Sequence, residues 1–449
     1  MNKKEFRRKL LQLVMPMTLQ YFMFSLVPVA DAIMLVRLDQ NAMSAVSLAG
    51  QVFFVLNLFN YAVTMGVSML AAQFWGNDDI PSIEQVWGLA TRIIVPVGLA
   101  FFAAGEIFPR QVMRIFTDGE PIIAYGVEYL RAVSASYIIV CIMEVVQIIM
   151  KNTGLVRQVT VISSCSVIIN IVLNAVMIYG LFGCPEMGVR GAAVATVISE
   201  AVSLIADIIV QSVRGRVRFR PACLLRVRGD VRHDFYKYTT PVFLNQMGWG
   251  LGFTTLTVIM GHLGEDAVAA NSVVAVVKDM ISCFCFALGS GGAIMVGNEL
   301  GAGRLEEAKE CGGRLCRLAI WSGAAAGLII FCSTPLIISF VNLTEQATFY
   351  LKWMLIMCVY YLVGRSINCT VIGGIFCAGG DTRFGFICDT VTMWCVIIPL
   401  GSIAAFVLKL PVLAVFFILN LDEMVKLPVV YKHYVKYKWV RNLTVHEDE

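Results

Sequence analysis

Long apolar runs alternate with short polar segments along the chain. Each run is close to the roughly 20 residues that an α-helix needs to cross the hydrocarbon core of a bilayer. The pattern predicts an all-α membrane protein with twelve transmembrane helices, over residues 10–36, 45–73, 88–109, 128–150, 158–182, 191–213, 239–262, 267–296, 317–341, 348–377, 384–408 and 411–431.

The composition agrees with this class. Of the 449 residues, 58% are hydrophobic and only 15% are charged, whereas soluble domains carry about 25% charged residues. The first apolar run is too long for the core of a signal peptide and lacks a small-residue cleavage site, so we expect it to remain as the first span. The 14 cysteines are scattered through apolar runs, where cysteine acts as a small buried hydrophobe.

Basic residues gather in three places: the N-terminal segment, residues 214–238 and the tail at 432–449. Lys and Arg accumulate in the cytoplasmic loops of membrane proteins. The three segments share one side only if each half of the chain has an even number of spans. We therefore expect a multi-pass cell-membrane protein with both termini in the cytoplasm. The modest net charge of +4 resides in short loops and indicates no nucleic-acid partner.

The two halves of the chain match each other at a fixed offset. Pro16 lies 225 residues before Pro241, and Gly76 lies the same distance before Gly301. Two repeats inserted in the same orientation form lobes related by an axis along the membrane normal, an arrangement found in alternating-access transporters. We expect an N-lobe, a basic cytoplasmic linker, a C-lobe and a cytoplasmic tail at residues 1–213, 214–238, 239–431 and 432–449, with a central cavity between the lobes.

Sequence motifs of other function classes are missing. There is no H-E-x-x-H, no G-x-S-x-G and no G-x-x-x-x-G-K-[ST], the signatures of metalloproteases, α/β-hydrolases and ATP-driven proteins. We therefore expect no enzyme, no cofactor and no metal beyond Na⁺ as a coupling ion. The expected partners are the lipid bilayer and small-molecule substrates, and the expected oligomeric state is a monomer.

Seven motifs follow one another over nearly the whole chain: "VADAIMLVRLDQNAMSAVSLAG" (29–50), "GVSMLAAQFWG" (66–76), "NIVLNAVMIYGLFGCPEMGVRGAAVAT" (170–196), "GHLGEDAVAANS" (261–272), "VGNELGAGRLEEAK" (296–309), "AGGDTRF" (378–384) and "DEMVKLPVVYKHYVKYKWVRNLT" (422–444). Together they resemble the MATE family, the multidrug and toxic compound extrusion exporters of the MOP flippase superfamily. The resemblance implies twelve helices in two six-helix lobes around a cavity. It also implies export of amphipathic organic cations driven by inward H⁺ or Na⁺.

Asp31 is the only charge in the first apolar run. If the helix enters the membrane near Leu10, Asp31 lies about 30 Å further along. A carboxylate at that depth must be paired, hydrated or protonated, which makes it a functional candidate. The alternative is an interfacial aspartate that reaches the headgroups, although its side chain is short and the apolar run continues past it. The resemblance assigns the aspartate on helix one to cation coupling.

Asn170, Asn174 and Thr196 are expected at the depth of Asp31. The two asparagines lie one turn apart on one helix face, and amide and hydroxyl oxygens suit a hard cation such as Na⁺. Interhelical hydrogen bonding is the structural alternative. Many MATE proteins carry a second carboxylate here, in the pattern N-x-x-x-D, whereas this sequence reads "NIVLN". Asp31 would then hold Na⁺ more weakly, or act as a lone protonatable group.

Five further polar residues are candidates for lining the cavity. Glu144 has an alternative role, because Lys151 lies two turns along the same helix face and could pair with it. Gln246 stands where some relatives carry a glutamate on helix seven, which argues against a carboxylate site there. The five are Gln20, Tyr21, Glu144, Gln147 and Gln246.

Six of the charged residues in predicted spans of the second half are candidates for an ion network. Asp422 and Glu423 lie four and three residues before Lys426, a spacing that allows pairing along a helix. Opposite charges in a membrane pair with one another, so we expect a structural ion network, with a second protonation site as the alternative. The six residues are Lys278, Asp279, Arg365, Asp422, Glu423 and Lys426.

Pro16 and Pro28 each remove a backbone donor from the first helix and weaken its hydrogen-bond ladder. A bend at these residues would change how Asp31 faces the cavity. The alternative is a static kink without a role in transport.

The sequence favours a cation-coupled antiporter that exports amphipathic, cationic organic compounds, that is, a multidrug efflux protein. A lipid-linked saccharide flippase of the same superfamily is the alternative. Such proteins need cationic side chains in a central cavity, and Lys278, Arg365 and Lys426 could supply them.

The repeat leads to a first prediction. In an experimental density map of the protein in lipid nanodiscs, residues 10–213 and 239–431 should superpose by a two-fold rotation about the membrane normal. An inverted relation between the halves, or halves that do not superpose, would contradict the predicted architecture.

Overall fold

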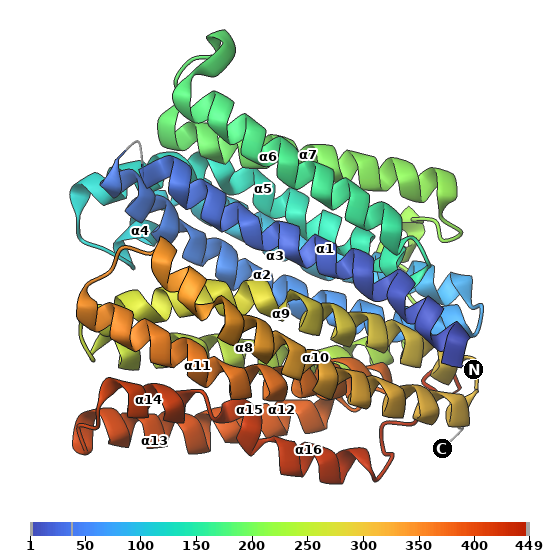
Figure 1. Ribbon diagram of the computed structural model, residues 1–449. Coiled ribbons are helices and arrows are strands. Elements are labelled where there is room, and N and C mark those ends of the chain that lie inside the picture. The colour runs from blue at the N-terminus through green and yellow to red at the C-terminus, as the bar shows by residue number, and fades with distance from the viewer. Residues whose placement is uncertain (1–2, 37–38, 446–449) are drawn as a thin grey trace. The chain divides into compact units, whose positions relative to one another are not determined.

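The computed structural model describes residues 3–36 and 39–445. These residues form helices and connecting loops, and no β-strand occurs among them (Figure 1). Arg37 and Leu38 of the motif at 29–50, and residues 446–449 of the predicted tail, lie outside the described residues. The long helices are α1 (Lys3–Val36), α2 (Gln40–Gly76), α3 (Ile80–Ile107), α5 (Glu120–Asn152), α6 (Val156–Tyr179), α7 (Gly188–Arg214), α8 (Gly229–Gly261), α9 (Glu265–Gly301), α10 (Leu305–Phe340) and α11 (Glu345–Asn368).

The C-terminal part is built from shorter elements joined end to end. α11 continues into a π-helical segment. Two more π-helical segments interrupt the helical stretch over residues 382–407. Such wide turns disturb the regular hydrogen-bond ladder and are frequent at functional sites. The short elements of the C-terminal part are η3 (Cys369–Phe376), α12 (Thr382–Thr390), η4 (Val391–Ile397), α13 (Ile398–Ser402), η5 (Ile403–Val407), α14 (Val412–Leu419), α15 (Asp422–Val425) and α16 (Leu427–Tyr434). Three further short elements lie earlier in the chain: α4 (Pro109–Arg114), η1 (Leu181–Gly183) and η2 (Pro221–Leu224).

Ten helical stretches of the described chain are long and apolar enough to cross a membrane. They coincide with ten of the twelve predicted spans. The predicted span 239–262 lies in α8, which is long enough but contains Asn245, Gln246 and several threonines that lower its hydropathy. The predicted span 411–431 is not one regular helix but the series α14, α15 and α16.

Local chemistry explains the interruptions of this last span. Asn420 follows α14, and its side-chain amide donates to the carbonyl oxygen of Phe416 at 2.9 Å, so the side chain competes with the backbone ladder. Pro428 stands at the start of α16 and has no backbone N–H to donate. α1, in contrast, is one continuous helix through both Pro16 and Pro28. All 14 cysteines lie in the described part as free thiols.

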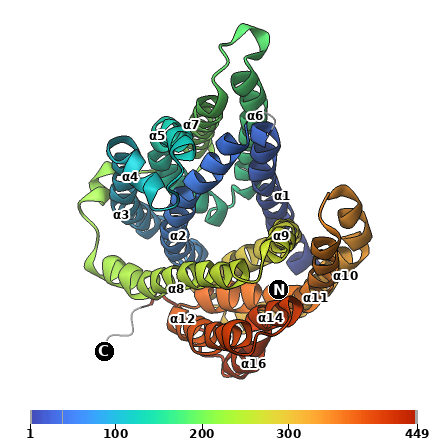
Figure 2. The ribbon, with the colours of Figure 1, turned by 90° about the vertical axis from the view of Figure 1, so that its left-hand side faces the viewer.

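The chain folds as two compact units. Unit 1 groups Met1–Tyr21, Ala72–Asn77 and Lys237–Glu449, and unit 2 groups Phe22–Ala71 and Asp78–Tyr236. In unit 2, α3 and α7 both pack on α5, and α6 packs on α7 (Figures 1 and 2). In unit 1, α9, α10 and α11 pack on one another, and η3 packs on α9.

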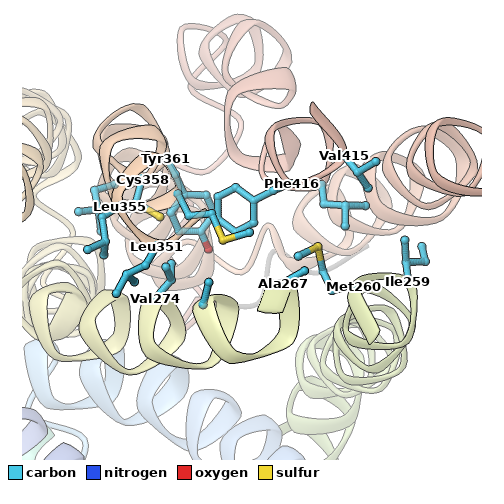
Figure 3. Close-up of a cluster of buried hydrophobic side chains, with 14 of the residues drawn as sticks. Ile259, Met260, Ala267, Val274, Leu351, Leu355, Cys358, Tyr361, Val415 and Phe416 are labelled. Carbon is cyan, nitrogen blue, oxygen red and sulfur yellow. The ribbon is translucent and has the colours of Figure 1, made fainter. Parts of the chain in front are cut away.

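An apolar core joins the elements of unit 1. Figure 3 shows Ile259 of α8, Val274 of α9, Leu351 of α11 and Phe416 of α14 gathered in one cluster. Each of these side chains is at most 2% exposed. Lipid tails are as apolar as these side chains, so close van der Waals packing rather than water exclusion holds such helices together.

The ends of α2 and α9 approach each other closely within unit 1. A Cβ atom added to Gly76 would lie 2.1 Å from the carbonyl oxygen of Asn298. One added to Gly301 would lie 1.9 Å from the carbonyl oxygen of Gln73. Gln73 and Asn298, like the two glycines, are 225 residues apart. The contact is therefore reciprocal, as a local two-fold axis requires.

A residue and its own repeat partner meet at the same contact. Ala72 and Gly297 are also 225 residues apart, and a Cβ added to Gly297 would lie 2.7 Å from the Cβ of Ala72. Two equivalent residues touch only near the axis that relates them. Small residues at this crossing let the backbones come together, and the contact agrees with the predicted parallel repeat.

Replacing Gly301 by alanine tests this crossing. The added methyl group overlaps the Gln73 carbonyl, and overpacking of this kind costs about 1–3 kcal/mol of stability. The purified Gly301→Ala protein should melt at a lower temperature than the wild type. Gly50→Ala on α2, where nothing lies within 4 Å of the added atom, is the control and should not lower the melting temperature. Equal melting temperatures for the two variants would contradict the close approach.

Candidate functional site

Asp31 belongs to a chain of hydrogen bonds within unit 2. Its Oδ1 atom accepts from Asn174 Nδ2 at 2.6 Å, and the same nitrogen donates to Asn170 Oδ1 at 3.3 Å. Asn170 Nδ2 in turn donates to Thr196 Oγ1 at 3.3 Å. The structure thus brings together the four residues that the sequence places at one depth.

Helix geometry explains how this chain forms. Asn170 and Asn174 occupy successive turns of α6, so their side chains point the same way. On α7, Thr196 Oγ1 donates to the carbonyl oxygen of Ala192 at 3.0 Å, which leaves the lone pairs of the hydroxyl for Asn170. Ser199, one turn later, offers a second acceptor to Asn170 at 3.4 Å. The hydroxyls of α7 therefore fix the amide of Asn170.

The polar chain is buried among apolar side chains. Asn170 is 4% exposed and Asn174 is fully buried, while Asp31 is half-buried. Tyr179 donates its hydroxyl to the carbonyl oxygen of Met34 at 2.7 Å and so ties α6 to α1 beside Asp31. An apolar cluster lies next to these residues, formed by Leu35, Ala42, Ile178, Val189 and Ala192.

One oxygen at this site is available for a ligand. Asn174 Oδ1 is buried and has no hydrogen-bond partner in the described structure. A protonated Asp31 could donate to such an oxygen, and a carboxylate with an amide oxygen can also coordinate a hard cation. No group of three or more His, Cys, Asp or Glu side chains suited to a metal ion occurs within residues 3–36 and 39–445. Asp31 and Asn174 thus place one carboxylate and one unpaired amide oxygen side by side.

Glu144 and Gln147 lie in a second polar cluster of unit 2. Gln147 Nε2 donates to Asp207 Oδ2 at 2.8 Å and to Ser163 Oγ at 3.3 Å. Glu144 interacts electrostatically with Lys151, as its alternative role requires. Gln147 is 5% exposed, so it binds neighbouring helices.

The other cavity candidates lie in unit 1. Tyr21 shares a hydrogen bond of 3.1 Å with Ser290, and its ring meets the ring of Phe286 edge to face. Gln20 is 1% exposed. Gln246 is half-buried.

The six charged residues of the second half form a network that includes a seventh. Arg365 Nη1 donates to Glu423 Oε1 at 2.8 Å. Lys426 Nζ lies 3.3 Å from Glu423 Oε2 and 2.9 Å from Asp389 Oδ1. Asp422 interacts electrostatically with the same two cations. The pairing of Glu423 with Lys426, predicted from their spacing along the helix, is confirmed. The structure adds Asp389 of α12 to the network.

The remaining two members lie on α9. Lys278 donates to Asn420 Oδ1 at 3.3 Å, and its ammonium group lies 4.1 Å from the ring centre of Tyr361, a cation–π distance. Asp279 interacts electrostatically with Lys278 and Arg365. All six predicted members therefore lie within reach of an opposite charge or a polar partner.

A small cavity borders this network in unit 1. Its volume is about 50 Å³, room for a few waters at most. On the wall of this cavity, Asn245 Nδ2 donates to Asp389 Oδ2 at 2.9 Å. The cavity is lined by Asn245, Gly248, Trp249, Arg365, Asp389, Thr390, Thr392, Met393, Trp394, Asp422 and Lys426. Gln246 is not among the lining residues, because the helix turns its neighbour Asn245 toward the cavity.

Sequence reasoning did not single out three carboxylates in predicted spans that the structure places in polar clusters. They are Glu200 and Asp207 on α7 and Asp389 on α12. The signal was present, because an acid inside a span is a functional candidate by default. These three residues belong to none of the quoted motifs and were not paired with a charged residue at a helical spacing, so the sequence alone did not single them out.

The chain is similar to known membrane transporters in sequence and in fold. A family model described as MatE matches residues 16–176 and 241–403. The probable multidrug resistance protein YoeA of Bacillus subtilis is 25% identical over 408 residues, which cover 88% of this chain and 86% of the relative. The probable multidrug resistance protein NorM of Thermotoga maritima is 24% identical, with coverages of 89% and 86%. A solved structure of a mutant of the Vibrio cholerae MATE transporter VcmN has a TM-score of 0.88 at 14% identity, over 98% of both chains.

The ion network is tested by removing one cation. Lys426→Ala leaves Glu423 and Asp389 with less positive charge in a buried setting, and breaking a buried pair costs about 3–5 kcal/mol. We expect a clearly lower melting temperature and lower expression. Lys432→Ala, at an exposed position of α16, is the control. If Lys426→Ala keeps its stability and loses only transport, the network has a functional rather than a structural role.

Proposed function

Because the chain belongs to the MatE family of multidrug transporters, we propose that it is an antiporter that exports amphipathic organic cations in exchange for inward-moving H⁺ or Na⁺. The observation that carries this proposal is the contact of Asp31 with Asn174 at 2.6 Å. Asp31 has no basic partner among the described residues, so its charge is balanced only when it takes up a cation.

Competition for one carboxylate supplies the coupling. The ionised carboxylate of Asp31 attracts an organic cation, and a proton or Na⁺ on the same group removes that attraction. Transfer of a carboxylate out of water favours its neutral form in general. Each ligand then weakens the other by the same factor, as linkage requires. Inward movement of the coupling ion would therefore drive release of the substrate outside.

Asn174, Asn170 and Thr196 are proposed to adjust the site. With Na⁺ bound, the free Oδ1 of Asn174 would serve as a ligand beside Asp31. With a proton bound, the same oxygen would accept the hydrogen bond of the carboxylic acid. Thr196 and Ser199 hold Asn170, which in turn orients Asn174. These residues support either coupling ion.

The flippase alternative is less well supported. A pyrophosphate group would need cationic side chains that are free to bind it. Arg365 and Lys426 are engaged with Glu423 and Asp389, and Lys278 is engaged with Asn420 and Tyr361. Releasing any of them would leave a carboxylate or an amide unsatisfied inside the membrane.

The proposed orientation follows from the basic loops. Arg214 ends α7, and Arg218 and Arg220 follow it. All three are exposed, as expected next to and within a cytoplasmic loop. We infer that both termini lie in the cytoplasm and that the protein works as a monomer in the cell membrane.

Asp31→Asn tests the proposed coupling residue. Asparagine keeps the size of the side chain and can still bond Asn174, but it cannot take up a proton or balance Na⁺. Purified Asp31→Asn protein in liposomes should fold and insert normally, yet fail to export a cationic dye when an H⁺ or Na⁺ gradient is imposed.

Asp118→Asn, in the exposed loop after α4, is the matched control and should pump as the wild type does. Imposing the two gradients separately on the wild type identifies the coupling ion. If the Asp31→Asn protein pumps at the wild-type rate, Asp31 is not the coupling group.

A further inference from the structure

α7 carries a buried polar stripe that begins at Ser199 beside the proposed coupling site and extends well beyond it. Ser199, Ser203, Asp207 and Gln211 recur at every fourth position, and none of them is more than 3% exposed. Side chains at this spacing share one face of a helix. That face belongs to a helix that packs on both α5 and α6.

Asp207 is the charged member of this stripe. It is fully buried, and Gln147 of α5 donates to its Oδ2 atom at 2.8 Å. The other oxygen, Oδ1, is buried and has no hydrogen-bond partner within the described chain. Ser163 of α6 lies 3.3 Å from the same Gln147 amide. A fully buried carboxylate with a vacant oxygen is costly unless it takes up a ligand.

The charges around Asp207 do not balance. Lys151 on α5 interacts with both Asp207 and Glu144, and Glu200 on α7 interacts with Glu144 and Asp207. α6 contributes the hydroxyl group of Ser163, which accepts from Gln147. These four titratable groups comprise three carboxyls and one ammonium group. In a membrane such a set approaches neutrality only by taking up cations.

A proton fits this set better than a metal ion. The described residues contain no group of three or more acidic, His or Cys side chains arranged to hold a metal ion. Carboxyls that interact strongly share protons and titrate as a group. The vacant Oδ1 of Asp207 can carry such a proton.

A cavity in unit 2 lies close to Asp207 along α7 and is a route by which a proton on Asp207 can reach water. Gln211 lies one turn beyond Asp207 on α7 and lines a cavity of about 380 Å³ in unit 2. Polar groups on its wall include Thr91, Ser212 and Arg218. The cavity is large enough for water and lies where α7 ends and the basic linker begins. Asp207 is therefore about 6 Å along the helix from a residue that borders this space.

The cluster is separate from the Asp31 site. Thr196, which belongs to the Asp31 chain, lies about 16 Å from Asp207 along α7. The hydroxyls of Ser199, Ser166 and Ser163 occur between them, and Ser166 Oγ donates to the Ser199 carbonyl at 2.8 Å. The two sites thus lie at different depths of one unit and are connected by polar groups.

We propose that Asp207, held by Gln147 and surrounded by Glu144, Glu200 and Lys151, is a second proton-binding group of this transporter. Its carboxylate takes up one proton to become the carboxylic acid and later returns that proton to water in the cavity beside Gln211. The inference rests on the proposed antiport and deepens it, because it makes H⁺ a coupling ion.

The experiment counts protons on the purified full-length protein. Detergent-solubilised protein in unbuffered solution is titrated between mildly alkaline and mildly acidic pH, and proton uptake is compared with that of Asp207→Asn. Asparagine can still accept the hydrogen bond of Gln147. The variant should take up about one proton less per molecule, and infrared difference spectra should lose one carboxylic-acid C=O band. Gly50→Ala on α2, which removes no titratable group, is the control and should take up as many protons as the wild type does.

Glu200→Gln is a second variant that keeps the proposal testable if Asp207→Asn does not fold. It removes a neighbouring negative charge and should move the midpoint of the Asp207 band to lower pH, because the remaining carboxyl ionises more easily. If Asp207 were only part of a structural ion pair, Glu200→Gln would change the melting temperature and leave the infrared band unchanged. Unchanged proton uptake together with an unchanged infrared band would overturn the proposal.

The outcome is separable from that of the antiport. Proton uptake by the purified protein needs no gradient and no substrate, so it can be positive even if Asp31→Asn still pumps. Conversely, loss of gradient-driven efflux in Asp31→Asn with wild-type proton uptake in Asp207→Asn would support the antiport and reject the second site.

Discussion

A bilayer offers no water to a polar group, so every buried charge must find its partner inside the protein or take up a cation. Unit 1 satisfies this requirement with opposite charges. Glu423 lies between Arg365 and Lys426, and Lys426 also binds Asp389. In unit 2, amide groups donate to two carboxylates, because Asn174 donates to Asp31 and Gln147 donates to Asp207. Lys151 interacts with Asp207 and Glu144, so one ammonium group faces more than one carboxyl. An amide orients a carboxylate without neutralising it, and we propose that the carboxylates of Asp31 and Asp207 exchange cations.

The repeat makes the difference between the halves informative. α2 and α9 meet through equivalent small residues, as Ala72 and Gly297 show. The residue equivalent to Asp31, 225 positions later, is Leu256, which packs against the apolar core of unit 1. The shared architecture therefore does not require a carboxylate at this position. A charge that packing does not require, and that the membrane penalises, is best explained by a role in transport.

The sequence predicted those features that depend on local spacing. Span lengths and the one-turn spacing of Asn170 and Asn174 follow from helix geometry, and the fixed offset of the repeat is read directly from matching residues in the two halves. Contacts between helices depend on how each helix is rotated about its axis, which spacing within one helix does not determine. For this reason Asp389 and Asp207 were not assigned to their partners, and Asn245 rather than Gln246 borders the cavity. Pro428 and Asn420 could have signalled the interrupted last span, because both disturb a helical ladder.

We propose that one carboxylate, that of Asp31, binds either a coupling ion or an organic cation. Calorimetric titration of purified wild-type protein with a lipophilic dye cation, repeated over a range of pH and of Na⁺ concentration, tests it most directly. The dye should bind more weakly as the concentration of H⁺ or Na⁺ rises, because the dye and the coupling ion compete for the ionised carboxylate of Asp31. Dye affinity that does not change with either ion would contradict it.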